Sequence, residues 1–96
     1  MTARAGLAAG GSAEADGAYR LDWEDGLLAV AMASPYTYRP EVRFLDVTNP
    51  AAPQLLGSTS LPDADDVVLH DGIAYVAAFE DGIIVLDARD PASPYP

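Results

Sequence analysis

From Tyr19 onward the apolar positions of this chain fall into short runs separated by turn residues, and no helical period is sustained over a dozen positions. Runs of this length that are rich in Val, Ile, Leu and Tyr are typical of β-strands. The pattern therefore predicts an all-β fold of short antiparallel strands. The predicted strands are Tyr19–Trp23, Leu27–Ala33, Val42–Val47, Gln54–Leu61, Val67–His70, Ile73–Phe79 and Ile83–Ala88.

The segments between these runs are of two kinds. Glu24-Asp25-Gly26, Asp71-Gly72 and Asp81-Gly82 are hairpin signals, because Gly adopts the positive φ that tight turns require. The longer connectors 48–53 and 89–94 contain proline, which cannot donate a hydrogen bond to a neighbouring strand and so marks strand ends.

The chain also contains an internal repeat. The Asp-Gly turn at Asp25 returns at Asp71 with an offset of 46 positions, and the apolar run that ends at Asp46 returns at Asp87 with an offset of 41. The offsets differ because the first copy has a five-residue insertion within 34–41. A period of about 41 residues with four short strands per unit is typical of a β-propeller blade.

The predicted architecture is about two blades of a β-propeller, each an antiparallel four-stranded sheet. We expect a flexible Ala/Gly-rich leader over 1–17, a first blade over 18–62 and a second blade over 63–96 that lacks its fourth strand. The continuously apolar runs Ile73–Phe79 and Ile83–Leu86 predict strands covered on both faces. Since a propeller closes with four to eight blades, two blades alone would leave apolar end faces open. Either the chain is a fragment of a longer protein, or several copies associate into a ring.

Two segments resemble a known repeat. Phe44–Pro53 and Ile84–Pro94 each contain an aliphatic run that ends in Asp, followed by Asn-Pro or Asp-Pro and a further Pro. This pattern resembles the LVIVD repeat, and Asp71–Ala77 is similar to a strand of that family. The resemblance spans Tyr19–Pro94 and implies a propeller fold, often in extracellular or cell-surface proteins. It supplies no catalytic residues, and no signal peptide is evident in this chain.

Composition limits the partners. With 15 acidic and 5 basic residues the chain has a formal net charge of −10, so phosphate backbones and anionic lipids would repel it. Nucleic acid is therefore not expected as a partner. Membrane insertion is not expected either, since no apolar run reaches the length that spans a bilayer. With no cysteine, the chain offers neither disulfides nor a thiolate metal site.

One edge of the predicted sheets gathers candidate binding residues, because alternate loops of an up-and-down meander lie at the same edge. The insertion and the connector between the two blades share that edge, whereas the Asp-Gly and Pro-x-x-Pro turns are expected at the opposite one. Tyr and Arg are enriched at binding hot spots. The alternative is a tolerated surface insertion beside a solvated acidic turn. The candidate binding residues are Tyr36, Tyr38, Arg39, Asp63, Asp65 and Asp66.

Other polar residues receive structural interpretations. Asp46 and Asp87 occupy equivalent positions after apolar strands, where a carboxylate can accept hydrogen bonds from the following turn. His70, the single histidine, is expected on a surface turn, and Trp23 is expected to pack between the blades. The three aspartates of the connector could offer oxygen ligands to Ca²⁺, but their spacing is not that of an EF-hand loop.

The functional prediction is a non-enzymatic module without cofactor, resident metal or catalytic residues. It would bind a protein partner or self-associate through its open blade faces, as part of a larger surface or secreted protein. Two alternatives stay open: the N-terminal part of a propeller hydrolase or lyase whose active site lies in other blades, and a two-blade unit that assembles into a ring.

Overall fold

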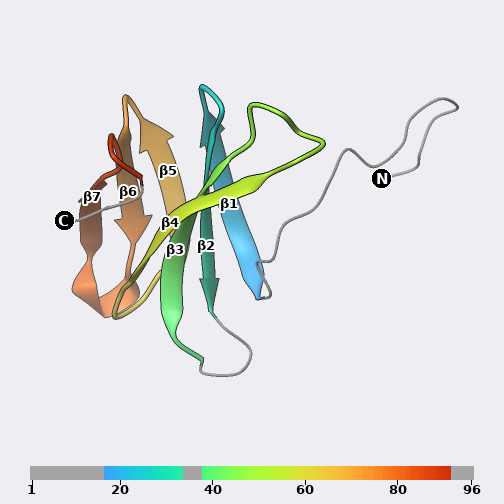
Figure 1. Cartoon of the computed structure of the whole chain (residues 1–96). Helices are drawn as coiled ribbons and strands as arrows, with labels where there is room; N and C mark the ends of the chain where they lie inside the picture. Colours follow the sequence, from blue (N-terminus) through green and yellow to red (C-terminus); the bar gives the residue numbers. More distant parts are fainter. Residues whose placement is uncertain (1–16, 34–37, 92–96) are drawn as a thin grey trace, which may run out of the picture.

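The computed structural model describes residues 17–33 and 38–91, which form two antiparallel sheets (Figure 1). Strands β1 (Ala18–Glu24), β2 (Leu27–Ala33), β3 (Pro40–Asp46) and β4 (Gln54–Ser60) make the first sheet, in chain order. Strands β5 (Asp66–His70), β6 (Ile73–Ala77) and β7 (Ile83–Asp87) make the second sheet. The all-β prediction is confirmed, and the described residues contain no α-helix, only a 3₁₀ turn, η1 (Phe79–Asp81).

Equivalent glycines close the first hairpin of each sheet. Gly26 and Gly72 have φ of 81° and 77°, and their carbonyls accept hydrogen bonds of 2.8 Å from the backbone N–H groups of Val47 and Ala88. A Cβ on Gly26 would lie 2.5 Å from Cγ2 of Thr48, and one on Gly72 would lie 2.6 Å from Cγ of Arg89. Both the turn conformation and the close approach of the next chain segment therefore require glycine.

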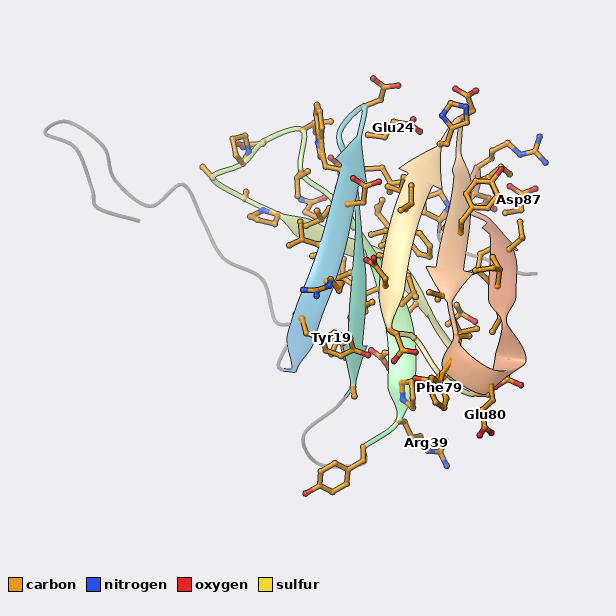
Figure 2. All side chains as sticks on the ribbon, turned by 180° about the vertical axis from the view of Figure 1, so that it is seen from behind. Tyr19, Glu24, Arg39, Phe79, Glu80 and Asp87 are labelled. Carbon is orange, nitrogen blue, oxygen red and sulfur yellow. The ribbon has the colours of Figure 1, made fainter. Side chains whose placement is uncertain are left out.

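One face of each sheet is buried against the other sheet, and we call these the inner faces. Phe44 and Val42 on β3 pack with Ala29 and Ala31 on β2, and Val67, Val76 and Leu86 meet them from the second sheet. Side chains alternate between the two faces of a strand, so every second residue of β2, β3, β5, β6 and β7 enters this core. The two sheets lie side by side, with β1 next to β5 (Figure 2).

Polar contacts join the sheets along β1 and β5. The Asp22 carboxylate accepts a hydrogen bond from the backbone N–H of Leu69 at 2.7 Å. The Glu24 carboxylate accepts bonds from Asp71 and Gly72 at 3.1 and 3.3 Å. Two carboxylates of the first sheet thus satisfy three backbone donors of the second.

The outer faces of both sheets expose apolar side chains. Val68, Tyr75, Ile83 and Val85 are exposed on the second sheet, although their strands are continuously apolar in sequence. The predicted cover on both faces is therefore present on the inner face alone, because the second sheet has a neighbouring sheet on one side only, and its outer face is one of the open apolar end faces expected of two blades. On the first sheet Leu21, Trp23 and Leu55 are exposed, whereas a second cluster on the same face, Val30, Met32 and Leu45, is buried.

Two further predictions need correction. Trp23 is not packed between the sheets: it is paired with Leu28 on the outer face of the first sheet and is 60% exposed. Strand β6 ends at Ala77 rather than at Phe79, which belongs to the 3₁₀ turn. The physical reason is that an apolar side chain is not always buried: strand register and the position of the turn decide its direction.

Candidate functional site

Three connections lie together at one end of the sheets, which we call the loop end. They are the described part of β2–β3 (residues 38–39), β4–β5 (61–65) and β6–β7 (78–82). The β4–β5 connection is bonded to the strand ends beside the other two, from Leu61 N to the carbonyl of Pro40 in β3 at 3.1 Å and from Asp65 N to that of Ala77 in β6 at 2.8 Å. Figure 2 shows Arg39, Phe79 and Glu80 at this end.

The loop end holds the described members of the predicted binding set. Tyr38 and Arg39 are exposed on the β2–β3 connection, and Tyr38 is the most exposed of the large apolar side chains at 80%. Asp63 is half-buried in the β4–β5 connection, whereas Asp65 and Asp66 are exposed there and at the start of β5. Tyr36 lies outside the described residues. Whether these residues bind a partner stays a prediction.

The expectation that every Asp-Gly turn lies at the opposite edge is wrong for Asp81-Gly82. This turn joins β6 to β7 and therefore lies at the loop end. The carbonyl of Gly82 accepts the backbone N–H of Ala78 at 2.8 Å, which closes the turn. The second strand-to-strand connection of a meander always returns to the end from which the first strand set out, whatever its sequence.

Phe79 is a loop-end residue that the sequence interpretation missed. It is 76% exposed and has φ of 49°, while Tyr38 has φ of 56°. Each lies four residues before a matched apolar position of its sheet, Val42 or Ile83, so the two aromatic residues are equivalent in the repeat. Left-handed backbone is costly for aromatic residues and gathers at functional positions. The repeat offset of 41 could have revealed this pair from sequence.

The β4–β5 connection concentrates negative charge beside Tyr19. The hydroxyl of Tyr19 donates a hydrogen bond to the carbonyl of Ala64, across the junction between the sheets. Burial raises the pKa of Tyr19, as do the nearby charges of Asp65 and Asp63. Partial desolvation, the charge of Asp63 and a hydrogen bond with that residue raise the pKa of Asp65. The loop end is therefore acidic as well as aromatic.

Asp46 and Asp87 have the structural role predicted for them. Asp46 Oδ1 accepts hydrogen bonds from the backbone N and the hydroxyl of Thr48, at 2.9 and 2.6 Å. Asp87 Oδ1 accepts the backbone N and Nε of Arg89, at 3.0 and 2.9 Å. These bonds lower the pKa of Asp46 and hold the pKa of Asp87 at about 2.

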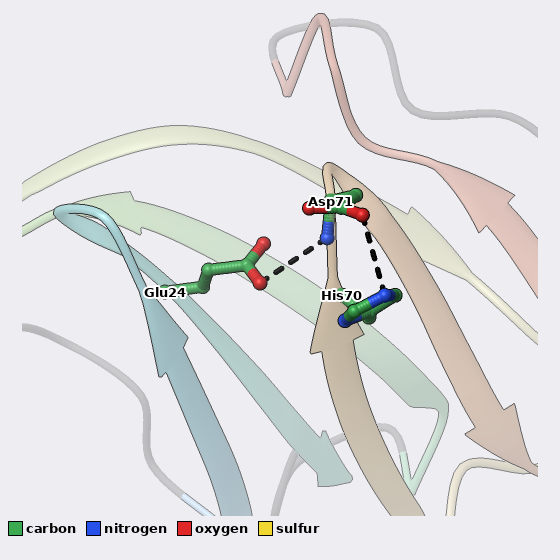
Figure 3. Close-up of side chains that lie close together, drawn as sticks. All are labelled: Glu24, His70 and Asp71. Carbon is green, nitrogen blue, oxygen red and sulfur yellow. Dashed lines mark hydrogen bonds and ion pairs between the residues drawn. The ribbon is translucent and has the colours of Figure 1, made fainter.

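The opposite end, which we call the turn end, brings three possible metal ligands together. Glu24, His70 and Asp71 have ligand atoms within 4.8 Å of one another, and His70 Nε2 lies 3.2 Å from Asp71 Oδ2 (Figure 3). Within the described residues this is the one such group, so Asp63, Asp65 and Asp66 do not converge on a common point. Both Glu24 oxygens accept backbone N–H bonds, which gives this carboxylate a structural task already.

A cleft of about 400 Å³ also lies at the turn end, between the hairpins of the two sheets. Its lining includes the charged residues Glu24, Asp46, Asp71 and Arg89. Most of these groups take part in hydrogen bonds within the chain. The cleft thus lies far from the predicted binding residues, and the loop end, with its exposed aromatic side chains, is the stronger candidate surface.

A comparison with protein-family models identifies one of the repeated segments. Residues 62–95 match the LVIVD repeat. The match covers about a third of the chain and includes all of the second sheet. The predicted resemblance to LVIVD-repeat proteins is confirmed there, on the segment that contains Asp71, Asp87 and Pro91. No curated protein and no solved structure matches the chain significantly.

The described residues also include no helix that is long and apolar enough to cross a membrane.

Proposed function

We propose that this chain is a non-enzymatic segment of a β-propeller, in which each sheet is one blade, and that it acts as a protein-binding or structural scaffold module. The packing of two tandem antiparallel sheets through opposite, non-equivalent apolar faces supports the propeller assignment. Neighbouring inner strands, β1 and β5, lie closest, as expected when blades radiate from a common axis. A surface or secreted location follows from the resemblance to the LVIVD repeat.

The loop end is the proposed binding surface, and the single observation that supports it best is the Tyr38–Phe79 pair. Two aromatic side chains that are 80% and 76% exposed, each on strained backbone, offer apolar area at little cost in side-chain entropy. Loops held by a rigid sheet scaffold are where binding residues concentrate. No comparable pair is found elsewhere among the described residues, since Asp25 and Asp71, the other residues with positive φ and a side chain, are polar.

The chemistry of this surface indicates the kind of partner. Acidic residues lie at the same end as the two aromatic residues: Asp63, Asp65 and Asp66 precede or begin β5, and Glu80 and Asp81 follow Phe79. A matching protein surface would have an apolar centre bordered by Arg and Lys. Complementary charge of this kind raises the association rate and weakens with salt.

A catalytic role is not proposed for the described residues. His70 is exposed, and its closest acidic neighbour is Asp71 in the same turn. A general base needs a nucleophile or a substrate pocket within hydrogen-bond reach. The turn-end cleft offers carboxylates and Arg89, whose hydrogen bonds maintain the hairpins.

The binding proposal is tested by affinity capture with three forms of the full chain immobilised at equal density. They are the wild type, the Y38S/F79S double variant, and the A51S/D90S double variant, which changes exposed turn-end residues. Support requires a protein that the wild type and A51S/D90S retain, that Y38S/F79S releases, and that dissociates at raised salt. Equal retention by all three forms would place binding elsewhere. The purified captured protein then serves for titration.

A further inference from the structure

The exposed outer face of the second sheet is equivalent, position by position, to the buried inner face of the first sheet. With the repeat offset of 46, Asp22 corresponds to Val68 and Ala29 to Tyr75. With the offset of 41 that follows the insertion, Phe44 corresponds to Val85. Ala29 and Phe44 are fully buried by the second sheet, whereas Tyr75 and Val85 are exposed. The same structural face is thus covered in one sheet and open in the other.

The converse holds for the outer face of the first sheet. The exposed Trp23 corresponds to the buried Leu69, and the outer-face residue Leu45 corresponds to Leu86 of the core. The face that the second sheet turns toward its neighbour is therefore present a second time on the first sheet, where it is exposed along β1 at Leu21 and Trp23, while Leu45 is buried in a second cluster. One molecule displays both halves of the contact that already holds its two sheets together.

We propose that a second copy of this chain docks on the outer face of the second sheet through the outer face of its own first sheet. This inference rests on the proposed function as a repeat module and specifies how the module self-associates. In the resulting contact, Val68, Tyr75 and Val85 of one copy meet Trp23 and Leu21 of the next. The contact joins two different faces, so it is heterologous and either closes into a ring or continues as an open chain.

Apolar complementarity and charge distribution favour this partner. The large side chains exposed along β1 of the first sheet and across the outer face of the second are apolar, and the charged pair on β3 of the first sheet, Arg43 and Glu41, is joined in an ion pair. Large exposed apolar patches on a soluble chain mark interaction sites. Within one molecule two such faces pack closely, since Ala29, Ala74 and Val76 between them are fully buried.

The junction between copies differs from the one within a copy in its polar contacts. Within a copy, Asp22 accepts the Leu69 backbone N–H. Between copies, Val68 takes the place of Asp22 and Trp23 that of Leu69. Valine has no carboxylate, so the backbone N–H of Trp23 receives no equivalent hydrogen bond. We therefore expect an association weaker than the packing within the chain, and dependent on protein concentration.

The test is a complementation experiment that uses size exclusion with light scattering on the full chain. The variant V85K blocks the outer face of the second sheet, and W23K blocks that of the first. Each variant alone is expected at 10.0 kDa, the mass of one chain. Their mixture is expected to form a 1:1 dimer, because each copy keeps the face that the other lacks. The molar mass of the wild type should exceed that of one chain, and the excess should grow with protein concentration.

Three results would overturn the proposal: a wild type that stays monomeric at every concentration, a mixture that stays monomeric, or single variants that associate like the wild type. Should either Lys variant fail to fold by circular dichroism, I83Q and L21Q replace V85K and W23K at more exposed positions of the same faces. Q54K, on the exposed end of β4, controls for the added charge. The Y38S/F79S variant should associate as the wild type does, because it leaves both outer faces intact. Failure of the loop-end proposal can therefore be distinguished from failure of the self-association proposal.

Discussion

The carboxylate of Asp22 on β1 accepts a hydrogen bond from the backbone N–H of Leu69 on β5, 47 positions along the chain, with 2.7 Å between Oδ2 and N. The donor belongs to a residue whose side chain is buried, and it lies on the edge of β5 that faces away from β6. An acidic residue of one sheet thus completes the hydrogen bonding of the other. Asp22 is therefore a determinant of how the two sheets pack.

Replacing Asp22 by Ala should lower the free energy of unfolding by about 1–3 kcal/mol, because the Leu69 N–H loses its partner at a half-buried junction. Urea denaturation at one low protein concentration measures the change. Asp90→Ala, which removes an exposed carboxylate, is the matched control and should leave stability nearly unchanged. Equal effects of the two substitutions would mean that the contact contributes only through net charge.

The hairpin glycines give a second prediction. Gly26→Ala combines a positive φ with a Cβ only 2.5 Å from the branched side chain of Thr48, which cannot move aside freely. Gly82→Ala has the positive φ of 71° but no atom within 4 Å of its Cβ. We expect Gly82→Ala to cost about 1–3 kcal/mol from backbone strain alone, because φ of 71° with ψ of −125° is a conformation that residues other than glycine rarely adopt. Gly26→Ala should cost a further 1–3 kcal/mol, roughly, from overpacking. The midpoints of urea denaturation compare the two variants.

Asp87 should contribute to acid sensitivity. Its pKa of about 2 in the folded chain lies below the ordinary value of 3.8, so its stabilising effect is present above pH 4 and is lost as the pH falls toward 2. Asp87→Asn should therefore lower the melting temperature at pH 7, and the difference from wild type should disappear near pH 2. A difference that persists unchanged at pH 2 would show that the side chain acts by packing instead.

Asp65 should behave in the opposite way. Its pKa is raised in the folded chain, so the ionised form is less favourable there than in the unfolded chain. Stability linked to this group is present at low pH and is lost as the pH rises through the folded-state pKa. Asp65→Asn should consequently raise the melting temperature at pH 7. Asp66→Asn, at the neighbouring exposed position, serves as the control for a lost charge.

Phe79→Ser should change the free energy of unfolding by less than about 1 kcal/mol, because an exposed surface substitution rarely costs more. Phe79→Gly should stabilise the chain slightly, since glycine adopts φ of 49° without strain. Thermal unfolding of both variants measures this. Marked destabilisation by Phe79→Ser would show that the ring belongs to the core and would remove it from the binding surface.

Much of the fold was predictable from local patterns. The strand positions, the hairpins at Gly26 and Gly72, and the role of Asp46 and Asp87 follow from turn chemistry and from the repeat. A turn of this kind is determined by neighbours within a few residues, so the amino-acid sequence contains the necessary information. The same local signals support the family resemblance that the match at residues 62–95 confirms.

The candidate binding surface was predictable only in part. That the insertion and the acidic connector share one end follows from the meander order, but Phe79 was assigned to a strand because it continues an apolar run. Its exposure results from the tight β6–β7 turn, closed by the bond from Ala78 N to the carbonyl of Gly82. A run of apolar residues cannot distinguish the last strand residue from the first turn residue.

By itself the sequence determined the strands, their order and the repeat, because these depend on short-range propensity and periodicity. Only the tertiary structure decided which face of each sheet is covered, that Trp23 and Val85 point outward, and that Asp22 and Glu24 reach the backbone of β5. The physical reason is that burial depends on the neighbour. An apolar strand records that its faces can be covered, and the packing of one sheet against another decides which of them is.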